Sequence, residues 1–150
     1  MLVRAGEVVA VHGIGGLGHL GVQYARQLGF ATVAITRGTD KASLARQLGA
    51  HHDSDAIAQE AVTALQKLGG ARVILATAPN APAISALMDG LSPGGTLVVP
   101  AAPAEPLTIS VISLISGRRS VAGWYAGTAR DAQETLAFSL LSAVHPMIEP

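Results

Sequence analysis

The glycines at positions 13, 15 and 18 restrict the folds open to this chain more than any other feature. They follow a run of apolar residues at 8–11 and precede a segment in which apolar residues recur at helical spacing. In a strand–loop–helix unit of this kind, the first glycine permits a tight turn, the second lets a pyrophosphate approach the backbone, and the third lets the helix pack closely on the strand. The free N–H groups and the dipole at the helix start then favour an anion.

This spacing predicts a dinucleotide-binding loop. Glycine-rich loops also form ordinary turns, but the strand before the loop, the helix after it and a second apolar strand at 31–36 favour the dinucleotide. The loop residues that we expect to bind the cofactor are Gly13, Gly15, Gly16, Leu17 and Gly18.

Strands and helices alternate along the whole chain. Strands are predicted at 7–12, 31–36, 51–53, 73–77, 96–99 and 120–123, with a turn at 93–95. Helices are predicted at 17–28, 40–48, 55–68, 80–91, 111–116 and 128–144, the last with Leu136, Phe138, Leu140 and Leu141 mostly on its buried side. Because the first five strands are unalternating, both sheet faces should be covered. We therefore predict one α/β domain over residues 1–150: a Rossmann, doubly wound, six-stranded parallel sheet with helices on both faces.

The composition narrows the possible partners. Hydrophobic residues make up 49% of the chain and charged residues only 13%, against about 25% in an average soluble domain, so part of the surface should be covered by another domain or subunit. The formal net charge is zero and the cations are scattered, which disfavours nucleic acid. No apolar run is long enough to span a membrane. The chain has no cysteine, which is compatible with the cytoplasmic location that we expect.

Several separated segments resemble one known family. The stretch 13–29 is similar to the coenzyme loop and first helix of medium-chain alcohol dehydrogenases, in particular the zinc-type, cinnamyl-alcohol-dehydrogenase-like branch. Segments 48–50, 91–99, 117–123 and 134–149 resemble the same family in the same order. The resemblance covers essentially the whole chain and implies a coenzyme-binding domain whose catalytic domain lies outside it. Zinc ligands and substrate pocket would lie in that other domain, so no catalytic or metal-binding residue is assigned here.

The end of the second predicted strand distinguishes NADP from NAD. A carboxylate there would bind both ribose hydroxyls and repel a 2′-phosphate. This chain instead carries Thr36 and Arg37, with Lys41 shortly after. A guanidinium and a phosphate form strong charge-assisted pairs, so NADP is favoured. The alternative is that Arg37 and Lys41 are solvated surface charges and that the cofactor is NAD.

Further cofactor contacts are expected where strands end, because the carboxyl ends of the strands face the ligand crevice. The fourth predicted strand places Thr77 and Ala78 there, and the fifth places Val99, Pro100 and Ala101. The family resemblance adds the loop of Gly123, Trp124 and Tyr125, where relatives hold the nicotinamide amide through backbone groups. Ordinary packing is the alternative at each of these positions.

Other polar clusters have plainer explanations. Adjacent histidines at 51 and 52 point to opposite faces of a strand, which disfavours a metal site. His19 follows the glycine loop, where a place near the pyrophosphate is the alternative, but it is expected on a helix surface. Asp131 and Glu134 are expected to stabilise a first helical turn. In zinc-type relatives the last strand pairs with its twin, so the resemblance implies a homodimer through residues 120–123.

Three functions remain open from the sequence. The first is the cofactor domain of a zinc-dependent alcohol dehydrogenase that transfers hydride between NADP(H) and an alcohol, aldehyde or ketone; the isolated domain would then be inactive. The second is a zinc-free quinone or enoyl reductase of the same superfamily. The third is a dinucleotide-sensing module without chemistry, which fold alone does not exclude.

Overall fold

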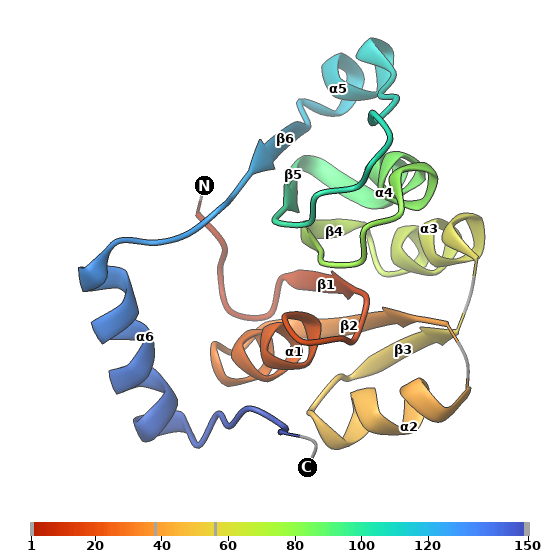
Figure 1. Cartoon of the computed structure of the whole chain (residues 1–150). Coiled ribbons are helices and arrows are strands. Elements are labelled where there is room, and N and C mark those ends of the chain that lie inside the picture. The colour runs from red at the N-terminus through yellow and green to blue at the C-terminus, as the bar shows by residue number, and fades with distance from the viewer. Residues whose placement is uncertain (1, 38, 56, 149–150) are drawn as a thin grey trace.

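The computed structural model describes residues 2–37, 39–55 and 57–148 and contains a single six-stranded sheet (Figure 1). The strands are β1 (Val8–His12), β2 (Ala31–Thr36), β3 (His52–Asp55), β4 (Ala71–Ala76), β5 (Leu91–Val99) and β6 (Ser120–Gly123). The helices are α1 (Gly18–Gln27), α2 (Thr39–Gln47), α3 (Ala58–Lys67), α4 (Ala81–Leu87), the 3-10 turn η1 (Met88–Gly90), α5 (Val111–Gly117) and α6 (Ala129–Ser142).

The strand order is β3-β2-β1-β4-β5-β6 and every pairing is parallel. The chain therefore moves outward from β1 to β3, crosses back, and continues from β4 to β6 on the other side. This reversal creates a topological switch point between the carboxyl ends of β1 and β4, where open α/β sheets bind ligands. The predicted doubly wound parallel fold is confirmed.

Helices cover both faces of the sheet, as predicted. One core cluster packs α3 and α4 on the sheet through Leu65, Ile84 and Leu87, and a second packs α1 and α2 on the opposite face through Val22 and Ala45. Neighbouring residues of β1 alternate between these clusters because successive side chains of a strand point to opposite faces. Each fully buried leucine contributes about 1.5–3 kcal/mol, so these two layers fix the strand ends that form the site.

The region after α4 differs from the prediction. The helix expected at 80–91 ends at Leu87, the turn η1 follows, and β5 already begins at Leu91, opposite Ala71 of β4. The expected turn at 93–95 lies within this strand as a shift of register. Gly95 makes the shift possible, because a Cβ there would lie 2.8 Å from the Ala71 carbonyl oxygen.

Two helix predictions also need correction. The third helix begins at Ala58 rather than near 55, because Asp55 is still part of β3. The last helix, α6, has no buried residue: Leu136, Leu140 and Leu141 are 66%, 84% and 87% exposed. Figure 1 shows α6 standing away from the sheet. Phe138 is only half-buried, beside Tyr24 of α1.

Candidate coenzyme-binding site

The glycine loop between β1 and α1 has the geometry that its spacing predicts. Gly13 has a φ of +90°, and a Cβ on it would lie 2.8 Å from Cβ of Ala78. A Cβ on Gly18 would lie 1.7 Å from the carbonyl oxygen of Gly13, so only glycine fits there. At Gly15 and Gly16, by contrast, an added Cβ would meet nothing within 4 Å. The loop is therefore closely packed where it turns and open on the side where a phosphate would approach.

The first turn of α1 is also available to an anion. Leu17 is the N-cap residue, its side chain is 60% exposed, and it makes no capping hydrogen bond. No acidic side chain lies in this first turn. The positive end of the helix dipole thus keeps its attraction for a negative group beside the loop.

Thr77, which follows β4, holds the loop in place. Its hydroxyl lies 2.9 Å from the carbonyl oxygens of both His12 and Gly13, and its backbone N–H donates to His12. The N–H of Ala78 donates to the same His12 carbonyl. The structure therefore brings both predicted residues to the loop, and the Thr77 hydroxyl is already hydrogen-bonded to the backbone of the loop.

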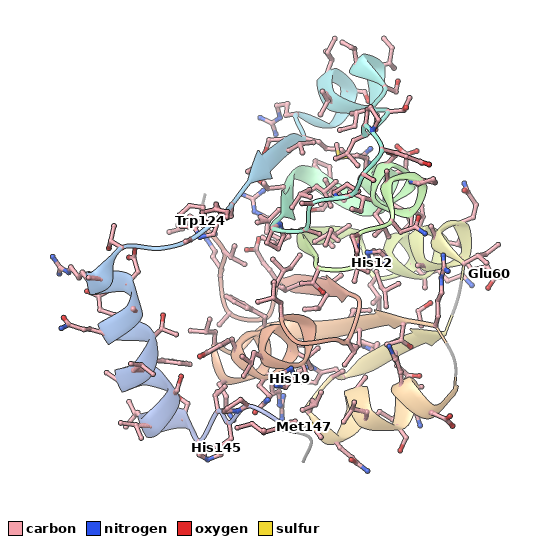
Figure 2. All side chains as sticks on the ribbon, in the orientation of Figure 1. His12, His19, Glu60, Trp124, His145 and Met147 are labelled. Carbon is pink, nitrogen blue, oxygen red and sulfur yellow. The ribbon has the colours of Figure 1, made fainter. Side chains whose placement is uncertain are left out.

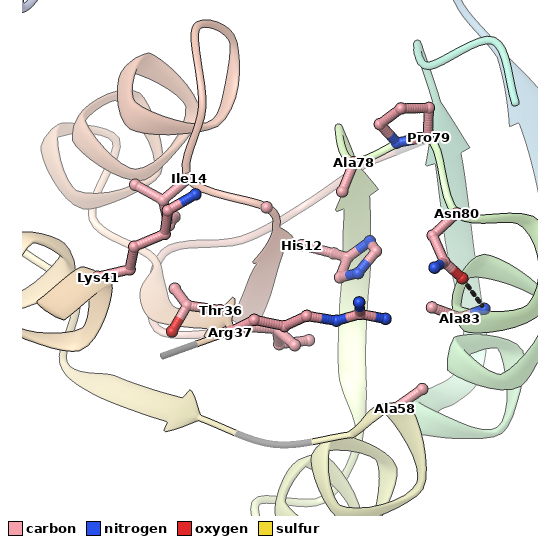
Figure 3. Close-up of a pocket in the computed structure, with 12 residues that line it drawn as sticks. His12, Ile14, Thr36, Arg37, Lys41, Ala58, Ala78, Pro79, Asn80 and Ala83 are labelled. Carbon is pink, nitrogen blue, oxygen red and sulfur yellow. Dashed lines mark hydrogen bonds between the residues drawn. The ribbon is translucent and has the colours of Figure 1, made fainter. Parts of the chain in front are cut away.

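A cavity of about 210 Å³ opens beside the loop at the carboxyl ends of β1 and β2 (Figure 3). It brings together five residues that the sequence singled out: Gly13, Thr36, Arg37, Lys41 and Ala78. Figure 3 shows Lys41 reaching from α2 toward Ile14 of the loop, and Arg37 reaching across the cavity.

The cavity wall is basic and has unused hydrogen-bonding capacity. Its described lining contains Arg37, Lys41 and His12 but no carboxylate. Two buried polar atoms on it, Oγ1 of Thr36 and Nδ1 of His12, have no hydrogen-bond partner among the described residues. Buried polar atoms in native proteins almost always have partners, so such orphans in a cavity indicate a polar ligand. Together with the open loop, these groups fit a phosphate-bearing nucleotide.

His12 is the titratable residue of this cavity that sequence reasoning missed, together with uncharged lining residues such as Ile14, Pro79 and Asn80. It ends β1, and the register places it opposite Ile35 of β2 and Ala76 of β4. Burial, and secondarily the nearby Arg37 guanidinium, lower the pKa of the His12 imidazole. Its position at the carboxyl end of the central strand was the signal that could have found it.

The remaining predicted contacts lie elsewhere. Val99, Pro100 and Ala101 follow β5, and Gly123, Trp124 and Tyr125 follow β6. The two segments are neighbours because Val99 pairs with Gly123 and the Trp124 N–H donates to Val99 at 3.3 Å. They are not part of the basic cavity, and the Trp124 and Tyr125 side chains are exposed.

The prediction that His19 lies on a helix surface is wrong. His19 is only 8% exposed, and the backbone N–H of Met147 donates to its Nε2 at 3.0 Å. Nδ1 therefore carries the proton and donates to the carbonyl oxygen of Gly15 at 3.0 Å. Gln23 exchanges two further hydrogen bonds with the backbone of His145. The C-terminal segment thus returns to α1 beside the glycine loop, as Figure 2 shows for His19 and Met147.

The other polar clusters make structural contacts. Nδ1 of His51 accepts from the Thr32 N–H, and Asp53 pairs with Arg46. Asp131 forms a capping box with Thr128 at the start of α6, and the Thr128 hydrogen bonds lower the pKa of its carboxyl group. Within the described ranges, no group of three or more histidine or acidic side chains is placed to hold a metal ion. Nor is any helix there long and apolar enough to cross a bilayer.

Comparisons with known proteins identify the class. The family model described as zinc-binding dehydrogenase matches residues 16–142. The alcohol dehydrogenase patD of Penicillium expansum is 38% identical over 149 residues, which are 99% of this chain and 44% of that protein. Cinnamyl alcohol dehydrogenase from Sorghum bicolor superimposes with a TM-score of 0.85 at 30% identity, over 97% of this chain and 41% of the other. A protein of Sinorhizobium meliloti 1021 that is assigned as a zinc-binding dehydrogenase and is bound to NADP superimposes with a TM-score of 0.83 at 25% identity. The match covers 97% of this chain and 44% of the other.

The chain belongs to the zinc-binding dehydrogenase family and corresponds to the coenzyme-binding domain of its zinc-type, medium-chain alcohol dehydrogenases. It spans less than half the length of the relatives that it matches.

Proposed function

We propose that this chain binds NADP(H) and positions it for hydride transfer to or from an alcohol, aldehyde or ketone. The observation that carries the proposal is the basic cavity at the end of β2, where Thr36, Arg37 and Lys41 surround a space whose described lining has no carboxylate. A 2′-phosphate would find there a guanidinium, an ammonium and an unpartnered buried hydroxyl. The NADP bound to the relative from Sinorhizobium meliloti supports this choice.

The nicotinamide would supply the hydride, and the chain would supply its orientation. The open glycine loop and the first turn of α1 would hold the pyrophosphate. The segments after β5 and β6 would then lie along the nicotinamide half, because they are on the other side of the switch point from the cavity at β2. Substrate and a polarising zinc ion would be held by a catalytic domain, without which residues 1–150 would be inactive.

Arg37→Ala tests the cofactor choice. Removing the guanidinium should weaken NADPH binding roughly 10–100-fold, the loss expected for one charge-assisted hydrogen bond of about 1.5–3 kcal/mol, and should change NADH binding less than about 3-fold. Isothermal titration calorimetry measures both. Lys67→Ala, which removes an exposed cation at the end of α3, is the matched control. Equal losses for both cofactors would overturn the assignment.

We also propose that β6 forms a homodimer contact. It is the edge strand after β5, all four of its residues are exposed, and Val121 is 37% exposed. An exposed apolar edge offers unpaired N–H and C=O groups to a second strand. Sedimentation analysis should show a dimer that Val121→Glu dissociates; a monomer at high protein concentration would contradict the proposal.

A further inference from the structure

His12 differs from the other described residues that line the cavity, because it can change its charge near neutral pH. Its ring is half-buried, its Nδ1 is fully buried without a partner among the described residues, and it lines the same cavity as Arg37. Figure 3 shows the imidazole ring and the Arg37 guanidinium next to one another at this cavity. The imidazole is therefore held beside the group proposed to bind the phosphate.

The groups around His12 are basic or neutral. Arg37 faces it from the end of β2, and Lys41 lines the cavity from α2. The β4–α4 connection contributes Ala78, Pro79 and Asn80, and α3 contributes Ala58. Glu60, the acidic residue in the first turn of α3, is exposed and is not part of the lining. No carboxylate among the described residues that line the cavity thus offsets the charge of a protonated His12.

The side-chain oxygen of Asn80 is engaged by the backbone: Oδ1 accepts from the N–H of Ala83 and caps α4. The amide of Asn80 is neutral at every pH, and Arg37 and Lys41 stay charged. Among the described lining residues, the imidazole of His12 is therefore the group whose charge can change near neutral pH. Burial and the Arg37 guanidinium keep the pKa of free His12 low, so the imidazole is neutral before a ligand binds.

We propose that His12 selects for NADP by taking up one proton from solvent when the 2′-phosphate binds, becoming an imidazolium that donates to the phosphate beside Arg37. The inference rests on the proposed NADP site. A phosphate carrying close to two negative charges reverses the local balance of charge and favours the imidazolium. Both ring nitrogens are donors in the imidazolium, so the ring can donate a hydrogen bond toward the phosphate.

This coupling has a definite sign. Bound NADP raises the pKa of His12. The affinity of the protein for NADP is therefore constant above the pKa that His12 has in the complex, and it rises as the pH falls through that value. It levels off again below the pKa of free His12. NAD lacks the 2′-phosphate, so its affinity should not follow this profile.

Calorimetric titration of the protein with NADP⁺ and NAD⁺ at pH 7.5, in two buffers of different ionisation enthalpy, tests the proposal directly. The buffer dependence of the heat gives the number of protons taken up. At this pH a free 2′-phosphate, with a second pKa near 6, is mostly dianionic already. We expect a fraction of one proton, clearly above zero, for NADP⁺ and none for NAD⁺.

His12→Gln should abolish the proton uptake and weaken NADP⁺ binding about tenfold, a loss of about 1.4 kcal/mol, while NAD⁺ binding stays within about 2-fold. His52→Gln, at an exposed histidine of β3 outside the cavity lining, is the control and should change neither. The wild-type measurement decides the question even if the His12 variant folds poorly.

The outcomes separate the two proposals. NADP⁺ binding in preference to NAD⁺ without proton uptake would overturn the role of His12 and leave the proposed function intact. Equal losses of both dinucleotides in His12→Gln would show that the imidazole serves the shared adenosine instead, which also overturns it. Failure of NADP⁺ to bind would overturn the proposed function and this inference together.

Discussion

The layered core, residues 8–99, and the C-terminal arm, residues 111–142, use similar apolar side chains in opposite ways. In the core, Leu65, Ile74 and Leu97 are fully buried between sheet and helices. In the arm, α5, β6 and α6 contain no buried residue, and side chains such as Ile112 and Leu140 are 72% and 84% exposed. The first region therefore supplies its own packing, whereas the second leaves apolar side chains exposed, as surfaces that mark interaction sites do.

The cavity belongs to the layered core. Every residue that lines it lies between positions 12 and 83. Trp124, which is expected to lie near the nicotinamide, belongs instead to the exposed arm. Under the proposed function, the adenosine half of the cofactor would therefore bind to the buried core, and the nicotinamide half would lie near the exposed arm.

The largest effect should come from the same substitution made in both regions. Leu65→Ala removes a fully buried side chain of α3 and should lower the free energy of unfolding by about 2–5 kcal/mol. Leu140→Ala on α6 should change it by about 0.5 kcal/mol or less. Urea denaturation measures both. A comparable loss of unfolding free energy in Leu140→Ala would show that the arm is packed in solution and would contradict the difference between the two regions.

The segment that follows the arm and contains Met147 behaves differently from the arm, because it returns to the core and contacts α1. His19→Ala removes the acceptor for the Met147 N–H and the donor to Gly15, and should cost about 1–3 kcal/mol. Amide exchange at Met147 should accelerate by at least tenfold in the variant. His52→Ala is the control at an exposed position. Unchanged exchange at Met147 would mean that the segment is not held by His19.

The smallest effect concerns how the free energy of unfolding of the ligand-free protein depends on pH. Since the pKa of His12 is lowered in the folded state, the unfolded chain binds the proton more readily below about pH 6.5. This contribution to stability is present above pH 6.5 and is lost as the pH falls toward the folded-state pKa. Denaturation at pH 7.5 and 5.5 should show a smaller pH effect in His12→Gln. An identical loss in both proteins would remove His12 as its cause.

Short sequence patterns predicted those elements whose structure depends on neighbouring residues in the chain. Strands β2 and β6 have the predicted bounds, and the glycine loop has the predicted form because Gly13 and Gly18 admit no Cβ. The early start of β5 was missed, since it depends on pairing of Leu91 with the distant Ala71.

The site was predicted in part for the same reason. Thr36, Arg37 and Lys41 are close in sequence and line one cavity. His12 joins them only through the register of β1 against β2, and His19 is buried only because Met147 returns from the far end of the chain. The apolar pattern of α6 predicted burial, but its apolar side chains remain exposed.

The central claim is that this fold holds NADP(H) through the basic cavity at the end of β2. Calorimetric titration of the protein with NADPH and, separately, with NADH tests it most directly. We expect both to bind, with NADPH at least about tenfold tighter, because only NADPH offers a 2′-phosphate to Arg37, Lys41 and Thr36. Equal affinity, or tighter binding of NADH, would contradict it.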